Sequence, residues 1–324
     1  MITFNNVTKT FDDGTVAVDD VSFTVEKGNL VTLIGPSGCG KTTTMKMINK
    51  LITLTSGTIT IDGKDVANED DVELRRNIGY VIQRIGLLPH MTIEENVSLV
   101  PKLKGWKKQD YEQKVDDLLD MVGLDPNVFK KRYPLELSGG QQQRIGVIRA
   151  LAGEPPIILM DEPFSALDPI SRQQLQDELK LLQERIHKTI VFVTHDIDEA
   201  VKIADQIIVM KNGSIQQIAS PTALLQRPAN SFVHSFIGEE RVKQAANNKG
   251  KHEAASIMKQ LPSDISTSTY PTISTNSPLQ EVARLMLSNH AEAIIVVNQS
   301  AQATGIIEKN QLLQELAGIQ EEAE

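Results

Sequence analysis

The chain contains 324 residues, of which 40% are hydrophobic and 23% are charged. This length exceeds that of a typical single domain and favours one large domain with a smaller appendage. The formal net charge of −9 disfavours a nucleic-acid-binding protein, because such proteins hold the phosphate backbone with a surplus of Lys and Arg. We therefore expect no nucleic-acid partner.

The cysteine content and the apolar runs favour a cytoplasmic protein. Cys39 is the only cysteine, which excludes an intramolecular disulfide and suits a reducing compartment. The first residues lack the basic start and apolar run of a secretory signal. The apolar runs are far shorter than the ~20 residues that a membrane-spanning helix needs. A role at a membrane would then depend on a partner.

Residues 2–238 alternate short β-branched runs with amphipathic helical patterns, which predicts an α/β core. Several of the strands are apolar on both faces, as parallel strands covered by helices on both sides should be. Between about residues 85 and 155 helical patterns replace the strands, which predicts an inserted helical subdomain with helices at 110–122 and 141–152. The predicted strands are residues 21–25, 30–34, 78–82, 157–161 and 189–194.

Residues 239–255 are polar and lack apolar periodicity, so they are predicted to be a linker. A compact unit follows at 256–324. Ser277 and Pro278 predict a helix cap and a first-turn proline ahead of apolar residues at helical spacing. The elements expected after this helix are a strand at 293–297, a turn at 298–302, a short strand at 305–307 and a final helix.

A glycine-rich segment at 35–42, Gly-Pro-Ser-Gly-Cys-Gly-Lys-Thr, follows the apolar strand at 30–34 and opens a helical pattern. Such a loop lets consecutive backbone N–H groups surround phosphates, and its glycines leave room for that approach. Lys41 would reach the β- and γ-phosphates, and the Thr42 hydroxyl would bind Mg²⁺. The alternative is a glycine-rich turn without a ligand. The predicted nucleotide-binding residues here are Gly35, Pro36, Ser37, Gly38, Cys39, Gly40, Lys41, Thr42 and Thr43.

The apolar strand at 157–161 ends in two carboxylates, Asp161 and Glu162. At the carboxyl end of a strand both side chains can reach a crevice where phosphates bind. Asp161 would hold Mg²⁺ through water, and Glu162 would be the general base that polarises the attacking water. An apolar strand that ends in Asp-Glu is more often simply a strand end, so this interpretation depends on the loop that begins at Gly35.

The pentapeptide Leu-Ser-Gly-Gly-Gln at 137–141 precedes a helical pattern and predicts a second anion-binding helix start. One ATP does not need two such sites. Together with Lys41 and Asp161, this pentapeptide resembles the signature of ABC ATPases, the motor subunits of ATP-binding cassette systems. The resemblance implies a head-to-tail homodimer, in which the signature of one subunit completes the ATP site of the other. The residues so implied are Ser138, Gly139, Gly140 and Gln141, with Ser138 and Gly140 acting in trans.

The same resemblance assigns roles to four further residues. Phe11 matches the aromatic residue that stacks on adenine, and Gln83 matches the glutamine that senses magnesium and water and links to the membrane subunit. His195 resembles the γ-phosphate switch histidine. Asp168 ends Ser-Ala-Leu-Asp at 165–168, which resembles the loop that contacts the other subunit. The implied catalytic residues are Lys41, Gln83, Glu162 and His195, and the implied magnesium ligands are Thr42, Gln83 and Asp161.

Four further segments narrow the resemblance: Arg-Arg-Asn-Ile-Gly-Tyr-Val-Ile-Gln at 75–83, Leu-Pro-His-Met-Thr at 88–92, Tyr-Pro at 133–134 and Gly-Gln-Gln-Gln-Arg at 140–144. They are similar to those of bacterial importer ATPases for the quaternary amines glycine betaine, carnitine and choline, which serve osmoprotection. This implies integral membrane permease subunits as partners, an extracellular solute-binding protein as an indirect partner, and a peripheral position on the cytoplasmic face of the plasma membrane. Two alternatives stay open, namely an importer ATPase for another small solute such as an amino acid, and a regulatory ABC ATPase without transport.

From about residue 256 the chain resembles one cystathionine-β-synthase (CBS) repeat. Such repeats usually pack in pairs, so a single repeat would pair with that of the dimer mate. Glu308 and Gln311 stand where ribose-binding repeats have a hydroxyl residue and an aspartate, which disfavours an adenosine ligand. A regulatory role and a dimerisation role both stay open. The expected fold is α/β: a P-loop NTPase ABC cassette, with a RecA-like core, an antiparallel β subdomain and the helical subdomain, followed by a small α+β CBS-like domain.

Overall fold

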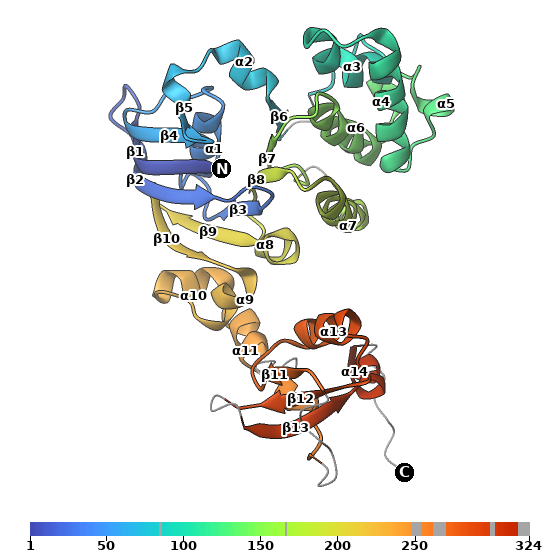
Figure 1. Ribbon diagram of the computed structural model, residues 1–324. Helices are drawn as coiled ribbons and strands as arrows, with labels where there is room; N and C mark the ends of the chain where they lie inside the picture. The colour runs from blue at the N-terminus through green and yellow to red at the C-terminus, as the bar shows by residue number, and fades with distance from the viewer. Residues whose placement is uncertain (84–85, 166, 248–253, 262–269, 299–301, 317–324) are drawn as a thin grey trace. The chain divides into compact units, whose positions relative to one another are not determined.

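The computed structural model describes residues 1–83, 86–165, 167–247, 254–261, 270–298 and 302–316 (Figure 1). The chain divides into two compact units, Met1–Gly238 and Glu239–Glu324. The first unit contains a small antiparallel sheet and a large sheet, and the second unit contains a three-stranded sheet.

The small sheet of the first unit has the strand order β2-β1-β4-β5. Alternate residues at the start of β1, Ile2 and Phe4, are buried, as expected where one face of a strand meets the core. Phe4 stacks on Phe23 of β2, and the ring centroids are 4.3 Å apart. The strand predicted at 21–25 is the second half of a longer strand. The strands are β1 (Ile2–Thr10), β2 (Val16–Val25), β4 (Ser56–Ile61) and β5 (Lys64–Asp65).

The large sheet has the order β10-β9-β3-β8-β7-β6, and all neighbouring strands are parallel except β10 and β9. Every residue of β3, β7 and β8 is buried, which confirms the expectation of parallel strands covered on both faces. The strands predicted at 78–82 and 189–194 each end one residue earlier. The strands are β3 (Leu30–Ile34), β6 (Ile78–Val81), β7 (Ile157–Asp161), β8 (Thr189–Val193), β9 (Gln206–Lys211) and β10 (Ser214–Ala219).

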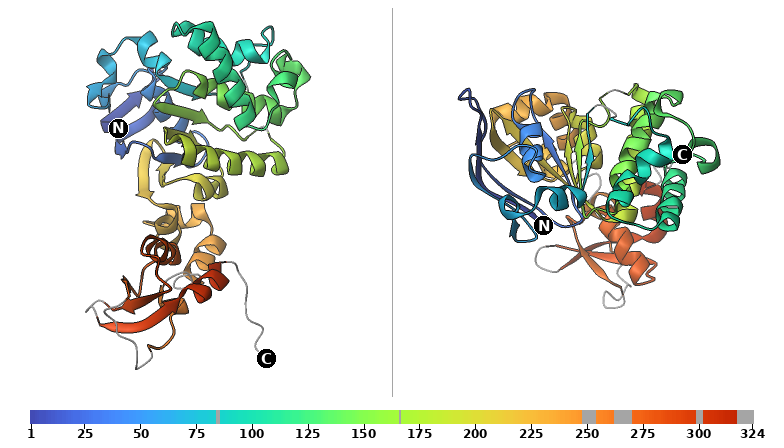
Figure 2. Two further views of the ribbon diagram at one scale, coloured as in Figure 1. Left: turned by 45° about the vertical axis from the view of Figure 1, so that its right-hand side comes forward. Right: turned by 90° about the horizontal axis from the view of Figure 1, so that it is seen from above.

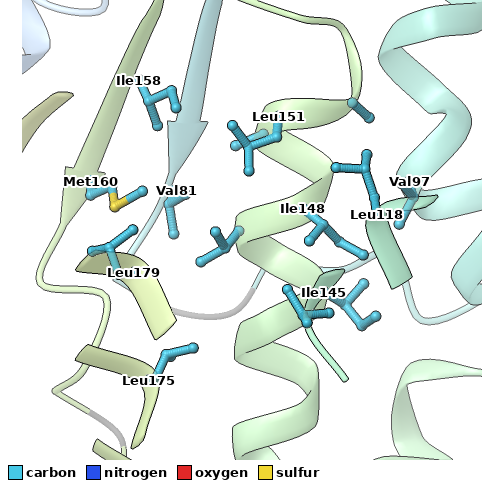
Figure 3. Close-up of a cluster of buried hydrophobic side chains, with 14 of the residues drawn as sticks. Val81, Val97, Leu118, Ile145, Ile148, Leu151, Ile158, Met160, Leu175 and Leu179 are labelled. Carbon is cyan, nitrogen blue, oxygen red and sulfur yellow. The ribbon is translucent and has the colours of Figure 1, made fainter. Parts of the chain in front are cut away.

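Two apolar layers cover the faces of the large sheet. Because side chains alternate along a strand, Ile158 and Met160 of β7 enter one layer and Leu159 enters the other. In the first layer, side chains of α6 lie between β6 and β7 on one side and α3 and α4 on the other (Figure 3). Figure 2 shows the small sheet and the helical subdomain on opposite sides of the large sheet.

The helical subdomain follows β6 and precedes β7 in the chain. Among its described residues, 86–156, the structure contains no strand. Capping boxes fix two of its helix starts, with Thr92 and Glu95 at α3 and Ser138 and Gln141 at α6. Its helices are α3 (Ile93–Leu103), α4 (Lys108–Met121), α5 (Pro126–Phe129), the 3₁₀ turn η2 (Pro134–Glu136) and α6 (Gly139–Ala152).

The remaining helices of the first unit connect the strands of its two sheets or follow the last strand. They are α1 (Lys41–Ile48), the 3₁₀ turn η1 (Val66–Asn68), α2 (Asp71–Arg76), α7 (Pro169–Ile186), α8 (Ile197–Ile203), α9 (Pro221–Gln226) and α10 (Ser231–Ile237). Helix α1 begins directly after the glycine-rich loop, and α8 begins two residues after His195.

The second unit contains a sheet of order β11-β12-β13, in which β11 and β12 are parallel and β13 is antiparallel to β12. Its core packs Leu279 and Val282 against Ile294, Val296 and Ile307. The predicted strand at 293–297 coincides with β12, and residues 299–301 of the predicted turn lie outside the described residues. The elements are α12 (Ala254–Ile257), β11 (Thr272–Ser274), α13 (Leu279–Ser288), β12 (Ala293–Val297), β13 (Ala303–Glu308) and α14 (Lys309–Leu316).

The structure differs from the sequence-based expectation at two places in this unit. Part of the predicted linker forms a helix, α11 (Glu239–Asn247), because the acidic first turn suits a helix start and Glu239 pairs with Lys243 at 3.2 Å. The predicted cap at Ser277 is wrong by one residue, since Pro278 is the N-cap of α13. The backbone of Ser277 bonds instead to Ser274 and Ala254.

Candidate active site

The glycine-rich loop connects β3 to α1 and leaves no room for larger residues at two positions. Gly35 and Gly40 have φ angles of 151° and 102°, in the region that favours glycine. A Cβ atom at Gly35 would lie 2.2 Å from the carbonyl oxygen of Met210, and one at Gly40 would lie 2.3 Å from that of Ala17. Neighbouring backbone therefore restricts both positions to glycine.

Lys41, the first residue of α1, is buried inside the loop that precedes it. Its Nζ atom donates hydrogen bonds to the carbonyl oxygens of Gly35 at 2.8 Å and Pro36 at 2.9 Å. It also lies 3.8 Å from the Sγ atom of Cys39, which is itself buried. The ammonium group is thus held within the curve of the loop, beside the N–H groups of the first turn of α1, which have no partner within the helix.

Thr42 and Asp161 bring a hydroxyl and a carboxylate together from α1 and the end of β7. The Thr42 hydroxyl donates to Asp161 Oδ1 at 2.9 Å. Burial raises the pKa of the Asp161 carboxyl above its usual value, and the Thr42 hydrogen bond and the charges of Lys46 and Lys41 offset part of that rise. Both groups are oxygen ligands of the kind that Mg²⁺ takes, so this pair fits a magnesium site.

Two polar side chains, from the ends of two other strands, contact the carboxylate of Glu162. Gln83, after β6, donates from Nε2 to Glu162 Oε2 at 3.0 Å, and His195 Nδ1, after β8, lies 3.3 Å from the same oxygen. Glu162 has a φ of 43°, and its backbone N–H bonds to Val193 of β8 at 2.9 Å. In a continuing strand, the side chains of Asp161 and Glu162 would point to opposite faces of the sheet. The left-handed backbone at Glu162 breaks this pattern, and both side chains lie at the same end of the sheet.

These residues surround one polar pocket of about 540 Å³. Ala17 also lines it, and the sequence held no signal for this residue because a methyl group has no distinctive chemistry. Asp161 reaches the pocket through Thr42, and Gly35 and Pro36 contribute the carbonyl groups that hold Lys41. The lining residues are Ala17, Ser37, Gly38, Cys39, Gly40, Lys41, Thr42, Thr43, Gln83, Glu162 and His195.

The second predicted helix start lies in a different place. Ser138 is the N-cap of α6; its Oγ accepts from Gln141 N at 3.3 Å, and its N–H donates to Gln141 Oε1 at 3.0 Å. Gly139 is exposed, and Ser138, Gly140 and Gln141 line a separate hollow of about 280 Å³. Within one protomer the two predicted anion-binding helix starts therefore do not share a pocket.

Two other predicted nucleotide-binding residues also lie outside the lining of the first pocket. Phe11 is 39% exposed, and Lys9 Nζ lies 5.1 Å from its ring centroid. Asp168 accepts at Oδ1 from the backbone of Ile170 at 3.1 Å, at the start of α7. Ala166 of the predicted subunit-contacting loop lies outside the described residues.

Known proteins are similar to this chain in sequence and in fold. The model of the ABC transporter family matches residues 18–165, and that of the CBS domain matches residues 263–318. The choline transport ATP-binding protein OpuBA of Bacillus subtilis is 50% identical over 95% of this chain and 78% of the relative. The chain belongs to the ABC transporter family.

Two further comparisons agree with the ABC assignment. The carnitine transport ATP-binding protein OpuCA of Listeria monocytogenes is 50% identical over 96% of this chain and 76% of its own length. A solved dimeric ATP-binding cassette in a post-hydrolysis state, with bound ADP and Pi, is 36% identical over 68% of this chain and 99% of its own, with a TM-score of 0.62. The predicted fold class is confirmed, and the ABC ATPase fold implies that this chain binds a nucleotide. In the described part of the chain, no helix combines the length and apolar character needed to cross a bilayer.

Replacement of Asp161 should raise the stability of the nucleotide-free protein and weaken its stabilisation by magnesium-ATP. The folded-state pKa of Asp161 lies above the ordinary value, so folding favours the neutral carboxyl group. As the pH rises through this folded-state pKa, the carboxyl group ionises and the free energy of unfolding falls. Asp161→Asn should therefore raise the melting temperature at neutral pH without nucleotide. It should also lose part of the added stability that magnesium-ATP gives the wild type, about 2.7 kcal/mol at 100 times Kd.

Differential scanning fluorimetry with and without magnesium-ATP measures both effects, and Asp12→Asn at an exposed site is the matched control. A lower melting temperature for Asp161→Asn without nucleotide would contradict the assigned direction of the pKa shift. An undiminished response to magnesium-ATP would contradict a metal site at Asp161.

Proposed function

We propose that this chain is the ATP-hydrolysing subunit of an importer for quaternary amines such as glycine betaine, carnitine or choline. The observation that carries this proposal is the extent of the similarity to the choline and carnitine transport proteins, which covers 95% and 96% of this chain and includes its second unit. A match to the cassette alone would support an ABC ATPase without indicating a solute.

Thr42, Asp161 and Gln83 are the residues that would hold Mg²⁺. The hydroxyl and the carboxylate are already 2.9 Å apart. When bound, the ion would neutralise charge on the phosphate oxygens. Lys41 would add a positive charge at the phosphates from inside the loop, where two carbonyl groups orient its ammonium group.

Glu162 is the group that we assign as the general base. Gln83 and His195 both contact its Oε2 atom, so the carboxylate is oriented by side chains from two other strand ends. An oriented carboxylate can accept a proton from water as the water attacks the γ-phosphate. His195 lines the same pocket and contacts Glu162, so it can interact with the γ-phosphate and with the base at the same time.

The separate location of the Ser138 helix start supports a head-to-tail homodimer. Within one protomer this helix start lines its own hollow and not the first pocket, so we expect it to face the nucleotide that is bound by another copy. The dimeric cassette of the same fold offers a precedent. In this arrangement ATP binding closes two copies and hydrolysis reopens them, driving integral membrane permease subunits at the cytoplasmic face of the plasma membrane. The solute-binding protein outside the cell is an indirect partner.

Glu162→Gln should bind ATP and hydrolyse it slowly. The amide keeps the shape of the side chain but cannot accept the proton, and a positioned general base contributes roughly 10²–10⁴-fold to a rate. Steady-state phosphate release and nucleotide binding, measured on the same preparation, test this. Glu73→Gln, at an exposed carboxylate on α2, should leave both unchanged. Turnover close to that of the wild type would show that Glu162 is not the base.

Ser138→Ala should weaken ATP-dependent dimerisation more than its effect on stability explains. Ser220 caps α9 with the same geometry, since its hydroxyl also accepts a backbone N–H at 3.3 Å. Either substitution should cost about 1 kcal/mol of stability through the lost cap. In the Glu162→Gln background, size-exclusion chromatography with light scattering should show fewer dimers for Ser138→Ala and unchanged dimers for Ser220→Ala. Equal dimer fractions would exclude a role for Ser138 in trans.

The solute can be identified only in the assembled importer, because we expect the solute to contact the permease and the solute-binding protein and not this subunit. In proteoliposomes that contain all components, glycine betaine, carnitine or choline should stimulate ATP hydrolysis, and glutamine and histidine should not. Stimulation by an amino acid alone would favour the alternative importer. Failure of any integral membrane protein to co-purify with the chain would favour an ABC ATPase without transport.

A further inference from the structure

Glu199 is a buried carboxylate just outside the nucleotide pocket. It lies in the first turn of α8 and is 5% exposed, and it is not among the residues that line the pocket. Burial raises the pKa of its carboxyl group above the usual value. An acidic residue in a first helical turn favours helix formation without being buried, as the exposed neighbour Asp198 shows, so helix stability does not account for the buried position.

The carboxylate of Glu199 is bonded to the segment that carries His195. Thr194, which is 2% exposed, donates from Oγ1 to Glu199 Oε2 at 2.5 Å. The same Thr194 oxygen accepts the backbone N–H of Asp196 at 3.0 Å. This chain of hydrogen bonds fixes the backbone on both sides of His195. The His195 side chain is 63% exposed, so its position depends on this backbone more than on packing around the ring.

The second oxygen of Glu199 faces the segment that follows Glu162. Glu199 Oε1 lies 3.9 Å from Nε of Arg172, and Arg172 also donates from Nη2 to the carbonyl oxygen of Leu167 at 3.1 Å. Arg172 belongs to α7, directly after the loop at 165–168. Glu199 therefore lies between the segment that bears His195 and the loop that follows the proposed base.

We propose that Glu199 is a positioning residue for ATP hydrolysis. It holds Thr194 and Asp196 so that His195 stays beside Glu162, and the guanidinium group of Arg172 neutralises part of its charge. A buried carboxylate is costly to desolvate, and a well-packed apolar side chain would fill the same space more cheaply. The inference rests on the proposed role of His195 and Glu162 in hydrolysis and adds a residue that acts through them.

The test compares Glu199→Ala, Glu199→Gln and Thr194→Val in the full chain, with ATPase kcat and KM as readouts. Glu199→Ala should lower kcat by about tenfold or more, because small displacements of a catalytic group are costly, and should leave KM for ATP within about twofold. Glu199→Gln should recover kcat to within about threefold, because the amide oxygen still accepts from Thr194. Thr194→Val should resemble Glu199→Ala. Asp198→Ala, in the same helical turn, should leave kcat unchanged.

The His195→Ala background shows whether Glu199 acts through His195. There, Glu199→Ala should have no further effect on kcat, because residues that act as a unit are not additive. An equal loss in both backgrounds, or an unchanged kcat in the wild-type background, overturns the proposal. If Glu199→Ala does not fold, the comparison of Thr194→Val with and without His195→Ala decides the question in the same way. Wild-type turnover by both His195→Ala and Glu162→Gln would instead refute the proposed catalytic assignment itself.

Discussion

Parallel pairing of β3, β8, β7 and β6 is the constraint on which the site depends. The register aligns Leu33 with Val193, Asp161 with Val193 and Val81 with Met160, so the four strands end at one edge of the sheet. The loop after each strand then supplies one part of the site. A slip of one residue would turn the side chains of a strand to the opposite layer, and the two apolar layers resist this because both are filled.

The site places polar and charged groups where burial and backbone conformation are unfavourable. Asp161 and Glu199 are carboxylates whose pKa values burial raises, and Glu162 adopts a left-handed backbone. Groups of this kind lower stability, and the large apolar core around β7 and α6 offsets that loss (Figure 3). Stability and the proposed activity are therefore in opposition at this edge of the sheet.

Much of the fold and part of the site could be predicted because the signals are local. The strands at 30–34 and 157–161 coincide with β3 and β7, and the glycine-rich segment lies between β3 and α1 as expected. The contacts of Gln83 and His195 with Glu162 join residues far apart in the chain. The resemblance to ABC ATPases implied that all three belong to one ATP site, but neither it nor any local pattern specified these contacts. No sequence pattern distinguishes Glu199 from an ordinary exposed acid, and only the packing of α8 shows that it is buried. The helix α11 lies within the segment predicted to be a linker, and its acidic first turn and the Glu239–Lys243 pair suit a helix in a polar segment.

The capping box at α6 has a chemical consequence for the Ser138 hydroxyl. A hydroxyl group offers one proton to donate and two lone pairs with which to accept. Acceptance of the Gln141 amide proton uses a lone pair and not the hydroxyl proton. Anchoring the helix start and donating to an external oxyanion are thus two separate capacities of one atom. The Ser138 hydroxyl can therefore donate its proton to a phosphate oxygen while it still accepts the hydrogen bond from the Gln141 N–H that caps α6.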